Sequence, residues 1–412
     1  MRSVLLIAPH NSYRIHAYIE AAQRLDIALV IASQSEFSLV SAVANGIQID
    51  FSDMALSLQR IVTAHQEHQF SAVIASDDGS VALVALVGKT LGLSANAEDS
   101  AELTRRKDLA RLRLKQHGQS IPGFRVINTS LPLLDQLSQL DYPVVVKPVS
   151  MSGSKGVIKA NNEQECIAAV ERIKPLLSQL ANEEERTTIL IEEFLDGPEV
   201  AYEGLLHKGR LRQLTIFDKP EPMNGPFFEE SYYISPSRHS VSWQKIIHQR
   251  VSEACVAYGL TEGPIHAELR LIDKDAYIIE IAARTIGGDC ADMLKFGLNI
   301  GLEELVLLQA MGKPIDIPEM KNSVGVLMIP IPEQGILRRV EGIEKAKKIN
   351  GITNIGISVR EGYELLPLPE GSSYLGFIFA KAPTQHLVES ALRAAQACLN
   401  VVIAPSFKVQ LG

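Results

Sequence analysis

Residues 264–284 of the chain read PIHAELRLIDKDAYIIEIAAR, two apolar runs that enclose the short polar stretch Asp273-Lys274-Asp275. Both runs are rich in β-prone residues, so the pattern predicts a β-hairpin. A three-residue loop over the polar stretch brings Glu268 opposite Glu280. Two carboxylates therefore face each other across the predicted hairpin.

The facing carboxylates need a counter-charge. Directly opposed side chains in a sheet lie about 5 Å apart, so like charges destabilise the pair, and burial among Ile and Leu raises that cost. A shared divalent cation offsets the repulsion, and a ligand set made only of oxygens suits Mg²⁺. The alternative is an exposed hairpin face on which Glu268 and Glu280 are merely solvated.

Composition limits the function classes. A chain of 412 residues is expected to divide into two to four units, and a net charge of −8 without a basic block argues against nucleic acid as a partner. Four widely spaced cysteines form no CxxC pattern, so neither zinc nor disulfides are predicted. The run Val4–Ala8 is too short for a signal peptide, and no run reaches the ~20 apolar residues of a membrane span. We therefore expect a cytoplasmic protein without a membrane partner.

The first 95 residues alternate apolar strands with helical patterns, which is typical of βαβ units and a parallel sheet. In such sheets ligands bind beyond the carboxyl ends of the strands, which places His10–Ser12 and Ser76–Gly79 at the mouth of a site. Further along, the pattern predicts one helix over Ser100–His117. The acidic run Glu183–Glu185 is interpreted as a solvated loop.

A second motif pairs a lysine with a Ser/Gly loop. Lys147 ends the apolar strand that begins at Val144, and Ser152-Gly153-Ser154 follows shortly after. One fixed ammonium and several free backbone N–H groups are the donors that phosphate oxygens need. Taken alone, the loop can equally be a flexible connector.

A third motif is an acidic hinge. An apolar strand ends at Glu192 and Glu193, continues through Phe194 and Leu195, turns at a Gly-Pro pair, and resumes at Glu199. The hinge lies between the lysine loop and the hairpin, so the three motifs follow one another along the chain.

In that order, these motifs closely resemble the ATP-grasp superfamily over about residues 100–300. The resemblance implies a mixed α/β and α+β chain with a doubly wound, Rossmann-like domain at 1–95, an ATP-grasp domain at 96–310 with its lid at about 122–190, and a C-terminal α+β subdomain at 311–412. It implies ATP and one or two Mg²⁺ ions as cofactors, with Mn²⁺ as an alternative ion.

The resemblance also implies residue roles by position. Its nucleotide-binding residues are Lys107, Lys147, Ser152, Gly153, Ser154, Glu192, Glu193, Phe194, Leu195 and Glu199. The lysines contact phosphates, the hinge holds adenine, and the last acid binds ribose hydroxyls. Its metal ligands are Glu268 and Glu280, and its catalytic residues are Lys219, Arg284, Gly287 and Gly288. For Lys107 the alternative is one of several surface cations.

One position departs from the superfamily pattern, since Ala282 stands where an Asn usually supplies a weaker ligand for a second metal ion. The surrounding Glu-Ile-Ala-Ala-Arg, with two glycines after it, nevertheless looks like the L-amino acid ligases of the bacilysin-synthetase type. The segment Phe217–Pro220 is similar to the one that lines their phosphate and amino-acid sites. His266 shares a strand face with Glu268 and is interpreted as a structural neighbour rather than a ligand.

The resemblance implies an ATP-dependent carboxylate–amine ligase that joins L-amino acids through an acylphosphate, with small-molecule substrates and a homodimeric assembly. One alternative is a biotin-carboxylase-like or purine-pathway enzyme that activates bicarbonate, although the chain has no Met-Lys-Met biotin-attachment site. Another is a nucleotide-binding regulator in which Ala282 has abolished turnover.

Overall fold

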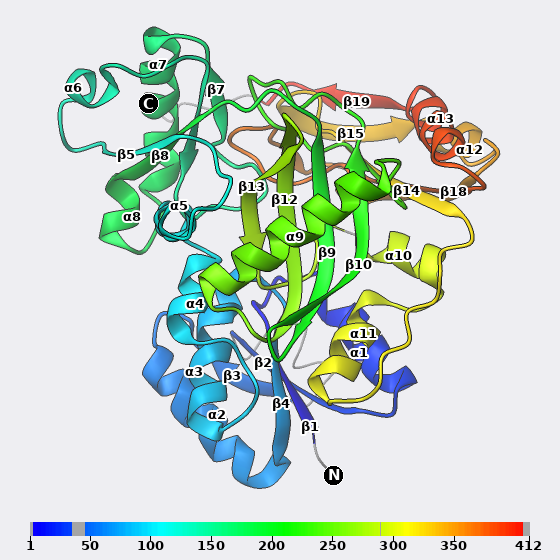
Figure 1. Cartoon of the computed structure of the whole chain (residues 1–412). Coiled ribbons are helices and arrows are strands. Elements are labelled where there is room, and N and C mark those ends of the chain that lie inside the picture. The colour runs from blue at the N-terminus through cyan, green and yellow to red at the C-terminus, as the bar shows by residue number, and fades with distance from the viewer. Residues whose placement is uncertain (1–2, 35–45, 289, 407–412) are drawn as a thin grey trace, which may run out of the picture.

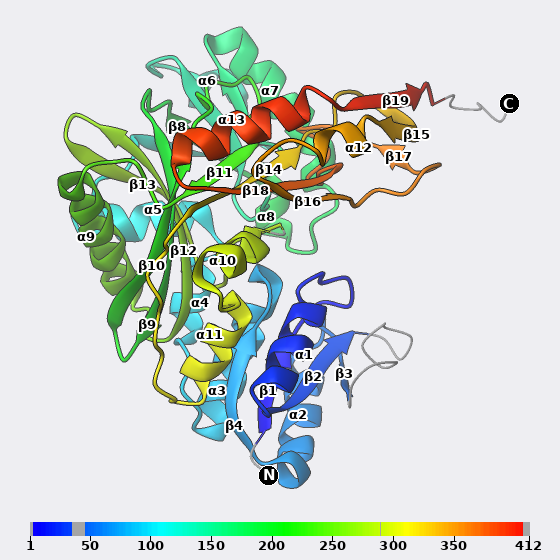
Figure 2. The same ribbon diagram turned by 90° about the vertical axis from the view of Figure 1, so that its right-hand side faces the viewer.

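The computed structural model describes residues 3–34, 46–288 and 290–406, and within these ranges the strands form four sheets. Figures 1 and 2 show the N-terminal unit at the bottom, a long sheet above it, and a smaller unit leaning over that sheet at the top left of Figure 1. The mixed α/β and α+β class predicted from the sequence is confirmed.

The N-terminal unit is a parallel sheet with helices on both faces. In spatial order its strands are β3 (Gly46–Ile49), β2 (Ala28–Gln34), β1 (Ser3–Ile7) and β4 (Phe70–Ala75). Its helices are α1 (Ile15–Arg24), α2 (Met54–His68) and α3 (Val81–Leu91), with the 3₁₀ helix η1 (Asp78–Ser80) before α3. One face packs on α2 and α3, and the other on α1 and the much later helix α11 (Leu302–Ala310). The sheet is therefore doubly wound, as the alternation predicts.

The smaller unit is an antiparallel sheet, which we call the lid sheet. Its strands in spatial order are β5 (Phe124–Asn128), β8 (Thr188–Glu193), β6 (Val144–Pro148) and β7 (Ile158–Ala160). Its helices are α6 (Leu133–Leu137), α7 (Glu163–Leu177) and α8 (Glu183–Thr187). The apolar side of α7 packs against the strands and forms a separate core. The lid sheet can therefore hold together as one body beside the long sheet.

The long sheet has eight antiparallel strands, which we call the central sheet. In spatial order they are β13 (Asp275–Ala282), β12 (Gly263–Ile272), β9 (Glu199–His207), β10 (Arg210–Lys219), β11 (Tyr232–Ser235), β14 (Ser323–Ile329), β18 (Gly376–Ala382) and β16 (Ile352–Ile357). The last three strands follow residue 311 in the chain, so the C-terminal third continues the same sheet.

Helices cover the central sheet and connect it to the other units. They are α4 (Glu98–Leu103), α5 (Lys107–Gln116), α9 (Val241–Tyr258), α10 (Cys290–Leu298), α12 (Ile343–Ala346) and α13 (Gln385–Gln396). A small sheet of β17 (Glu364–Leu365), β15 (Gly335–Glu341) and β19 (Asn400–Ala404) projects beside α12 and α13 (Figure 2). Helix α9 packs on β13 and β10, whereas α13 packs on β14 and β18.

Two sequence predictions about local structure are wrong. The single helix expected over Ser100–His117 is two helices, because Arg106 has an extended backbone and caps α5 at Lys107. The acidic run is helix α8 rather than a solvated loop. Its third acid, Glu185, is buried and forms an ion pair of 2.7 Å with Arg105. Both differences arise because the α4–α5 junction packs against the lid sheet, which a local pattern does not reveal.

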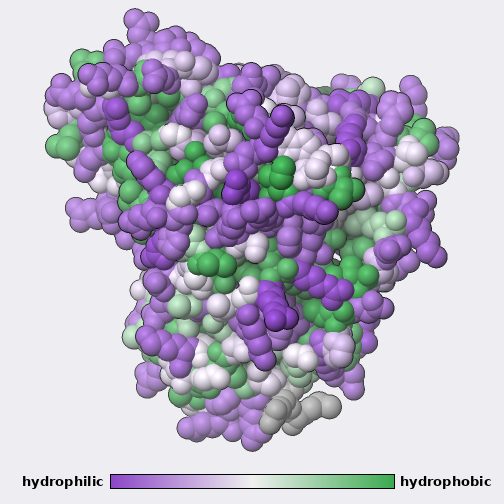
Figure 3. Space-filling view, viewed as in Figure 1, coloured by the Kyte–Doolittle hydropathy of each residue, from purple (hydrophilic) through white to green (hydrophobic). Residues whose placement is uncertain are grey.

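The described residues contain no helix that is both long and apolar enough to cross a membrane. Figure 3 shows that the face seen in Figure 1 is hydrophilic over most of its area, with hydrophobic residues in small separate groups.

Candidate functional site

A cavity of about 730 Å³ lies where the lid sheet, the central sheet and loops of both terminal units meet. It is lined by every site residue predicted from the sequence except Lys219. These residues are Lys107, Lys147, Ser152, Gly153, Ser154, Glu192, Glu193, Phe194, Leu195, Glu199, Glu268, Glu280, Arg284, Gly287 and Gly288. Residues that lie as far apart in the sequence as Lys107 and Gly288 are thus gathered on one surface.

The hairpin of β12 and β13 pairs Glu268 with Glu280, as predicted, but its loop differs from the predicted one. The loop has two residues, Asp273 and Lys274, both with positive φ (48° and 68°), as in a type I′ turn. A two-residue loop alone would pair Glu268 with Ile279. A β-bulge inserts Ile279 as an extra residue and so restores the pairing of Glu268 with Glu280.

The bulge has an identifiable support. The Arg111 side chain donates a hydrogen bond of 2.5 Å to the carbonyl oxygen of Ile279, the residue that the bulge leaves outside the regular ladder. Arg111 is almost fully buried and also pairs with Glu192 at 2.5 Å. Sequence reasoning missed Arg111, because nothing in a helical Arg-rich stretch distinguishes the one arginine that points inward.

Lys147 and Glu192 form a buried pair at the lid side of the cavity. Lys147 Nζ lies 2.5 Å from Glu192 Oε2, while Arg111 holds the other carboxylate oxygen. Burial alone raises the pKa of Glu192, but the charges of Arg111 and Lys147 outweigh burial and hold that pKa below its usual value. The Glu192 side chain therefore stays ionised and positions Lys147, while the Glu192 backbone pairs with Phe124 and Val145 inside the lid sheet.

Arg270 organises the hinge and was not predicted. Its guanidinium donates hydrogen bonds to Glu199 Oε2 (3.0 Å), the Leu195 carbonyl (2.9 Å) and the Met223 carbonyl (2.6 Å). It also lies 5.3 Å from the ring centroid of Phe194. A signal was present in the sequence, since Arg270 follows Glu268 by two positions and so shares its strand face.

Glu280 lies at the lid side of the hairpin. Lys107 Nζ is 3.0 Å from Glu280 Oε1 and donates a second hydrogen bond of 2.7 Å to the Met151 carbonyl. Met151 immediately precedes the Ser/Gly loop 152–154. The break between α4 and α5 places Lys107 at the start of α5, where its backbone N–H also binds the Val149 carbonyl. Lys107 is thus a link between the hairpin and the lid sheet rather than a surface cation.

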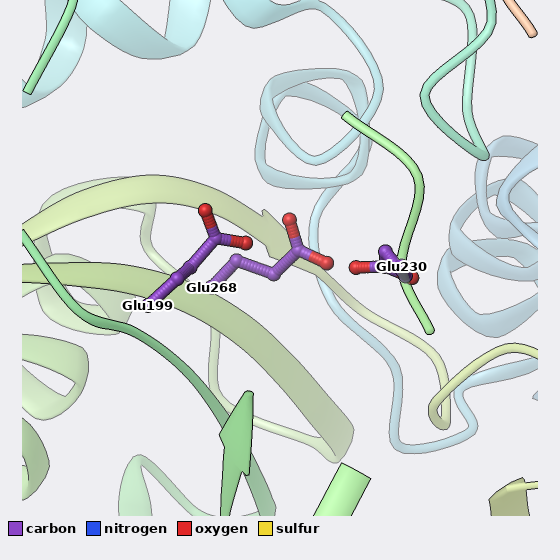
Figure 4. Close-up of side chains that lie close together, drawn as sticks. All are labelled: Glu199, Glu230 and Glu268. Carbon is purple, nitrogen blue, oxygen red and sulfur yellow. The ribbon is translucent and has the colours of Figure 1, made fainter. Parts of the chain in front are cut away.

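Glu268 lies on the opposite side, in a group of three acids around Lys219. Lys219 Nζ is 2.7 Å from Glu199, 2.5 Å from Glu230 and 3.3 Å from Glu268. Figure 4 shows Glu199 and Glu268 on neighbouring strands, directed toward Glu230 from a separate segment. The three acids could hold a metal ion by their geometry, but in this structure the Lys219 ammonium lies among them and offsets part of their charge. Lys219 therefore lies behind the cavity wall.

His266 adds a second cation next to Glu268. Its Nδ1 lies 3.0 Å from the buried carboxylate of Glu203, and its Nε2 lies 3.8 Å from Glu268. Burial alone lowers the pKa of His266, but hydrogen bonds to Glu203 and Glu268 outweigh burial and raise that pKa to about 9. For Glu268, burial raises the pKa, yet Lys219 and His266 lower it to about 2. His266 is therefore a structural neighbour of Glu268, as interpreted from the sequence, and keeps that carboxylate ionised.

The N-terminal unit closes the other end of the cavity. Arg284 Nε lies 3.0 Å from both carboxylate oxygens of Asp78. Arg14 is buried and donates hydrogen bonds to Asp77 Oδ1 (2.8 Å) and to the Ile286 carbonyl (2.9 Å). The two predicted segments at the carboxyl ends of β1 and β4 therefore border the site, although the sequence did not single out Arg14.

The part of the chain after residue 311, which we call the C-terminal unit, also reaches the cavity, through the loop of residues 367–374. The N–H of Gly156 donates a hydrogen bond of 2.9 Å to the Pro369 carbonyl, and Arg172 forms an ion pair of 2.6 Å with Glu370. Ser372 and Tyr374 line the cavity from this loop. The lid sheet is therefore held by this loop as well as by Lys107, a contact that the sequence does not predict.

Comparison with known proteins agrees with this geometry. A model of the ATP-grasp domain matches residues 140–293, and a model of the L-amino acid ligase C-terminal domain 2 matches residues 327–404. The crystal structure of an L-amino acid ligase from Bacillus licheniformis superposes with a TM-score of 0.85 at 27% identity, covering 98% of this chain and 100% of that one.

Curated sequences give two further relatives. Dapdiamide A synthase of Enterobacter agglomerans is 24% identical over 74% of this chain and 74% of its own length. Alanine–anticapsin ligase of Bacillus subtilis is 25% identical over 64% of this chain and 58% of its own length. Phosphoribosylglycinamide synthetase of Anaerococcus prevotii shares only the fold, with a TM-score of 0.70 at 16% identity. The chain thus contains an ATP-grasp domain followed by an L-amino acid ligase C-terminal domain, and its fold is similar to that of an L-amino acid ligase over nearly its whole length.

Proposed function

We propose that the chain is an ATP-dependent carboxylate–amine ligase that joins two L-amino acids. The carboxylate of one attacks the γ-phosphate of ATP, ADP leaves, and the amine of the other displaces phosphate from the acylphosphate to form an amide. One observation carries the proposal. A single cavity is lined by the two lysines proposed to bind phosphates, the paired carboxylates of the hairpin, and Arg284, although they belong to different units of the chain.

The hinge end of the cavity suits a nucleotide. Glu193 and Leu195 line the cavity beside Phe194, and Glu199 is held by Arg270 at the position assigned to ribose binding. The ammonium groups of Lys107 and Lys147, with the N–H groups of the Ser/Gly loop, provide the positive field that phosphates require. ATP is therefore proposed to lie between the lid sheet and the central sheet.

The hairpin suits a hard divalent cation. Glu268 and Glu280 are directly paired on adjacent strands and offer oxygen ligands only. When bound there, Mg²⁺ neutralises charge on the β- and γ-phosphates. The Glu230 carboxylate lies beside Glu268 and offers an oxygen that could take the place of the Asn missing at Ala282. Mn²⁺ is proposed as an alternative ion, since its ligand preference is similar.

Arg284 marks the reacting end. The Arg284 guanidinium, which Asp78 holds in place, can bind the substrate carboxylate and then stabilise the oxyanion that forms when the amine attacks. The backbone at Gly287 and Gly288 adds N–H donors beside it. Gly288 has a φ of +61°, and a Cβ there would lie 3.1 Å from the Phe377 ring, so a side chain would strain this turn.

Water exclusion is the remaining requirement, because an acylphosphate hydrolyses readily. The lid sheet is held by Lys107 and by the loop 367–374. These two contacts favour a closed cavity during transfer. The similarity to dapdiamide A synthase and alanine–anticapsin ligase, whose names specify amide or peptide formation, supports amino acids as substrates. A homodimer is proposed from the superfamily resemblance alone.

The test is phosphate release measured over all pairs of the common L-amino acids, with mass detection of the dipeptide. We expect phosphate and product in equal amounts for a subset of pairs. Glu280→Gln should abolish both, whereas the matched variant Glu333→Gln, at an exposed turn, should retain them. Phosphate release that requires bicarbonate and yields no dipeptide would overturn the proposal in favour of a bicarbonate-activating enzyme. ATP binding without turnover across the panel would indicate a nucleotide-binding regulator.

A further inference from the structure

A second cavity of about 410 Å³ lies at the junction of the N-terminal unit and the central sheet. Its wall combines β4 and α3 from the first unit with α11 and the start of β12. It shares no lining residue with the main cavity. Protein interiors are normally packed without voids of this size, and about 300–1,000 Å³ is the range of small-molecule sites.

The chamber of this cavity is apolar. Ile74, Val81, Val306, Pro264 and Met311 contribute to its wall. Several positions carry alanine, which leaves the space unfilled. An apolar side chain of moderate size is the natural complement to such a chamber, because its burial removes apolar surface from water.

The rim of the cavity is polar and carries one available cation. Glu262 already accepts hydrogen bonds of 3.2 Å from His207 and from the Lys208 backbone N–H. The Lys208 ammonium has no carboxylate within ion-pair distance among the described residues. Lys208 is exposed and lines the cavity, so its charge can bind an anion that lies at the rim.

The inner wall carries an unsatisfied acceptor. Gln309 donates a hydrogen bond to the Leu206 carbonyl, whereas its Oε1 is buried without a hydrogen-bond partner in the described structure. Buried polar atoms are nearly always paired, and Gln309 borders the chamber. A ligand with an N–H donor besides its carboxylate complements this wall better than a simple fatty acid.

The position of this cavity connects it to the reacting end of the main one. Its wall residues Ala75 and Ala283 immediately precede Ser76 and Arg284. Ser76 accepts a hydrogen bond of 3.0 Å from Arg14, and Arg284 pairs with Asp78. The two cavities therefore lie on opposite sides of the same two backbone segments.

We propose that this second cavity is a binding site for an apolar L-amino acid, with its side chain in the chamber and its carboxylate on Lys208. It is distinct from the proposed substrate site. The existence of the site does not depend on the ligase reaction, although its ligand class overlaps with the proposed substrates.

The test is calorimetric binding of L-leucine to the full chain without ATP, with 3-methylbutylamine as the analogue that lacks the carboxylate. We expect a saturable leucine site that the amine occupies more weakly, because the amine lacks the contact with Lys208. Ala310→Leu, which fills the chamber from α11, should abolish this site. Lys208→Ala should weaken it about two- to fivefold, the effect of one exposed ion pair, and Lys208→Arg should restore it.

Ala310 and Lys208 lie outside the residues assigned to ligation, so dipeptide formation should persist in their variants if the proposed function is right. Leucine binding that is unchanged in Ala310→Leu and in Lys208→Ala would overturn the inference, because the ligand would then lie in the main cavity. Absence of leucine binding to the wild-type chain would do so as well. Loss of ligase activity with intact leucine binding would count against the proposed function only.

Discussion

The two acids of the hairpin are direct neighbours on adjacent strands of the central sheet, yet their side chains are held by different parts of the molecule. Glu268 is surrounded by Lys219, His266 and their partners, all of which stand on the central sheet or the loop beside it. Within the described part of the chain, Glu280 forms an ion pair with Lys107, whose ammonium also binds the backbone before the Ser/Gly loop.

The two acids proposed to bind the metal ion therefore differ in what fixes their positions. Glu268 is fixed by a network that exists without any ligand, so its position and charge are set in advance. Glu280 depends on Lys107, and through it on the lid sheet. A cation bound by both acids would therefore couple the position of the lid sheet to the central sheet. The following predictions test this division.

The largest expected effect comes from the acids themselves. Glu268→Gln and Glu280→Gln should each lower kcat by about 100-fold or more, since a bound divalent cation supplies several kcal/mol of charge stabilisation. The measurement is steady-state ADP formation over a Mg²⁺ titration. Similar losses are expected if both acids share one ion. A mild effect of Glu280→Gln alone would contradict the shared site and leave Glu280 only its contact with Lys107.

Arg270 tests the fixed side of the comparison. Arg270→Lys keeps the charge but loses the forked contacts to Glu199, Leu195 and Met223. We expect KM for ATP to rise about 10- to 100-fold, the range for hydrogen bonds to charged groups of about 1.5–3 kcal/mol. The fall in kcat should be much smaller. Arg338→Lys, at an exposed position, is the matched control. A change in kcat without a change in KM would show that Arg270 does not act through the nucleotide.

Glu185 tests the attachment of the lid side. Burial raises the pKa of Glu185, but hydrogen bonds from Arg105 and Ser150 outweigh burial and keep that pKa below the usual carboxyl value. A lowered folded-state pKa stabilises the fold above the unfolded pKa of about 4.5, and this stability is lost as pH falls through the folded-state pKa. Glu185→Gln should lower stability at pH 7 by about 1–3 kcal/mol.

The check for Glu185 is denaturant unfolding of wild type and variant between pH 7 and pH 3. The gap between their free energies of unfolding should narrow as the pH falls. Glu184→Gln is the control, because Glu184 is exposed and forms an ion pair of 3.2 Å with Arg106. A gap that stays constant with pH would show that the Glu185 carboxylate is not selectively stabilised in the folded state.

The smallest expected effect concerns the contact of the lid sheet with the C-terminal unit. Arg172 and Glu370 are partly exposed, so their pair contributes at most about 1 kcal/mol. Arg172→Ala should raise the share of ADP formed without dipeptide by up to about fivefold, because the cavity closes less completely. The double variant Arg172→Glu with Glu370→Arg should restore coupling. Failure of that swap would show that the ion pair does not help to close the cavity. The hydrogen bond from the Gly156 N–H to the Pro369 carbonyl would then be the contact that matters at this loop.

The candidate site was largely readable from the sequence where residue type and order carried the signal. The lysine strand, the Ser/Gly loop, the hinge and the hairpin each combine an apolar run with polar residues at its end, a pattern that survives folding. The residues missed, Arg111, Arg270 and Arg14, are arginines within ordinary amphipathic segments. Their function lies in which buried carbonyl or carboxylate they reach, and that depends on the packing of distant elements.

The sequence by itself determined the types of element, the order of the motifs and the pairing of two acids across a hairpin, because strand periodicity and turn residues act over short distances. Only the tertiary structure decided how that pairing is achieved, through a bulge at Ile279 held by the buried Arg111. It also decided that Lys219 is enclosed by three acids and that Lys107 faces the lid. The physical reason is that charge pairing and burial are set by neighbours far apart in the chain.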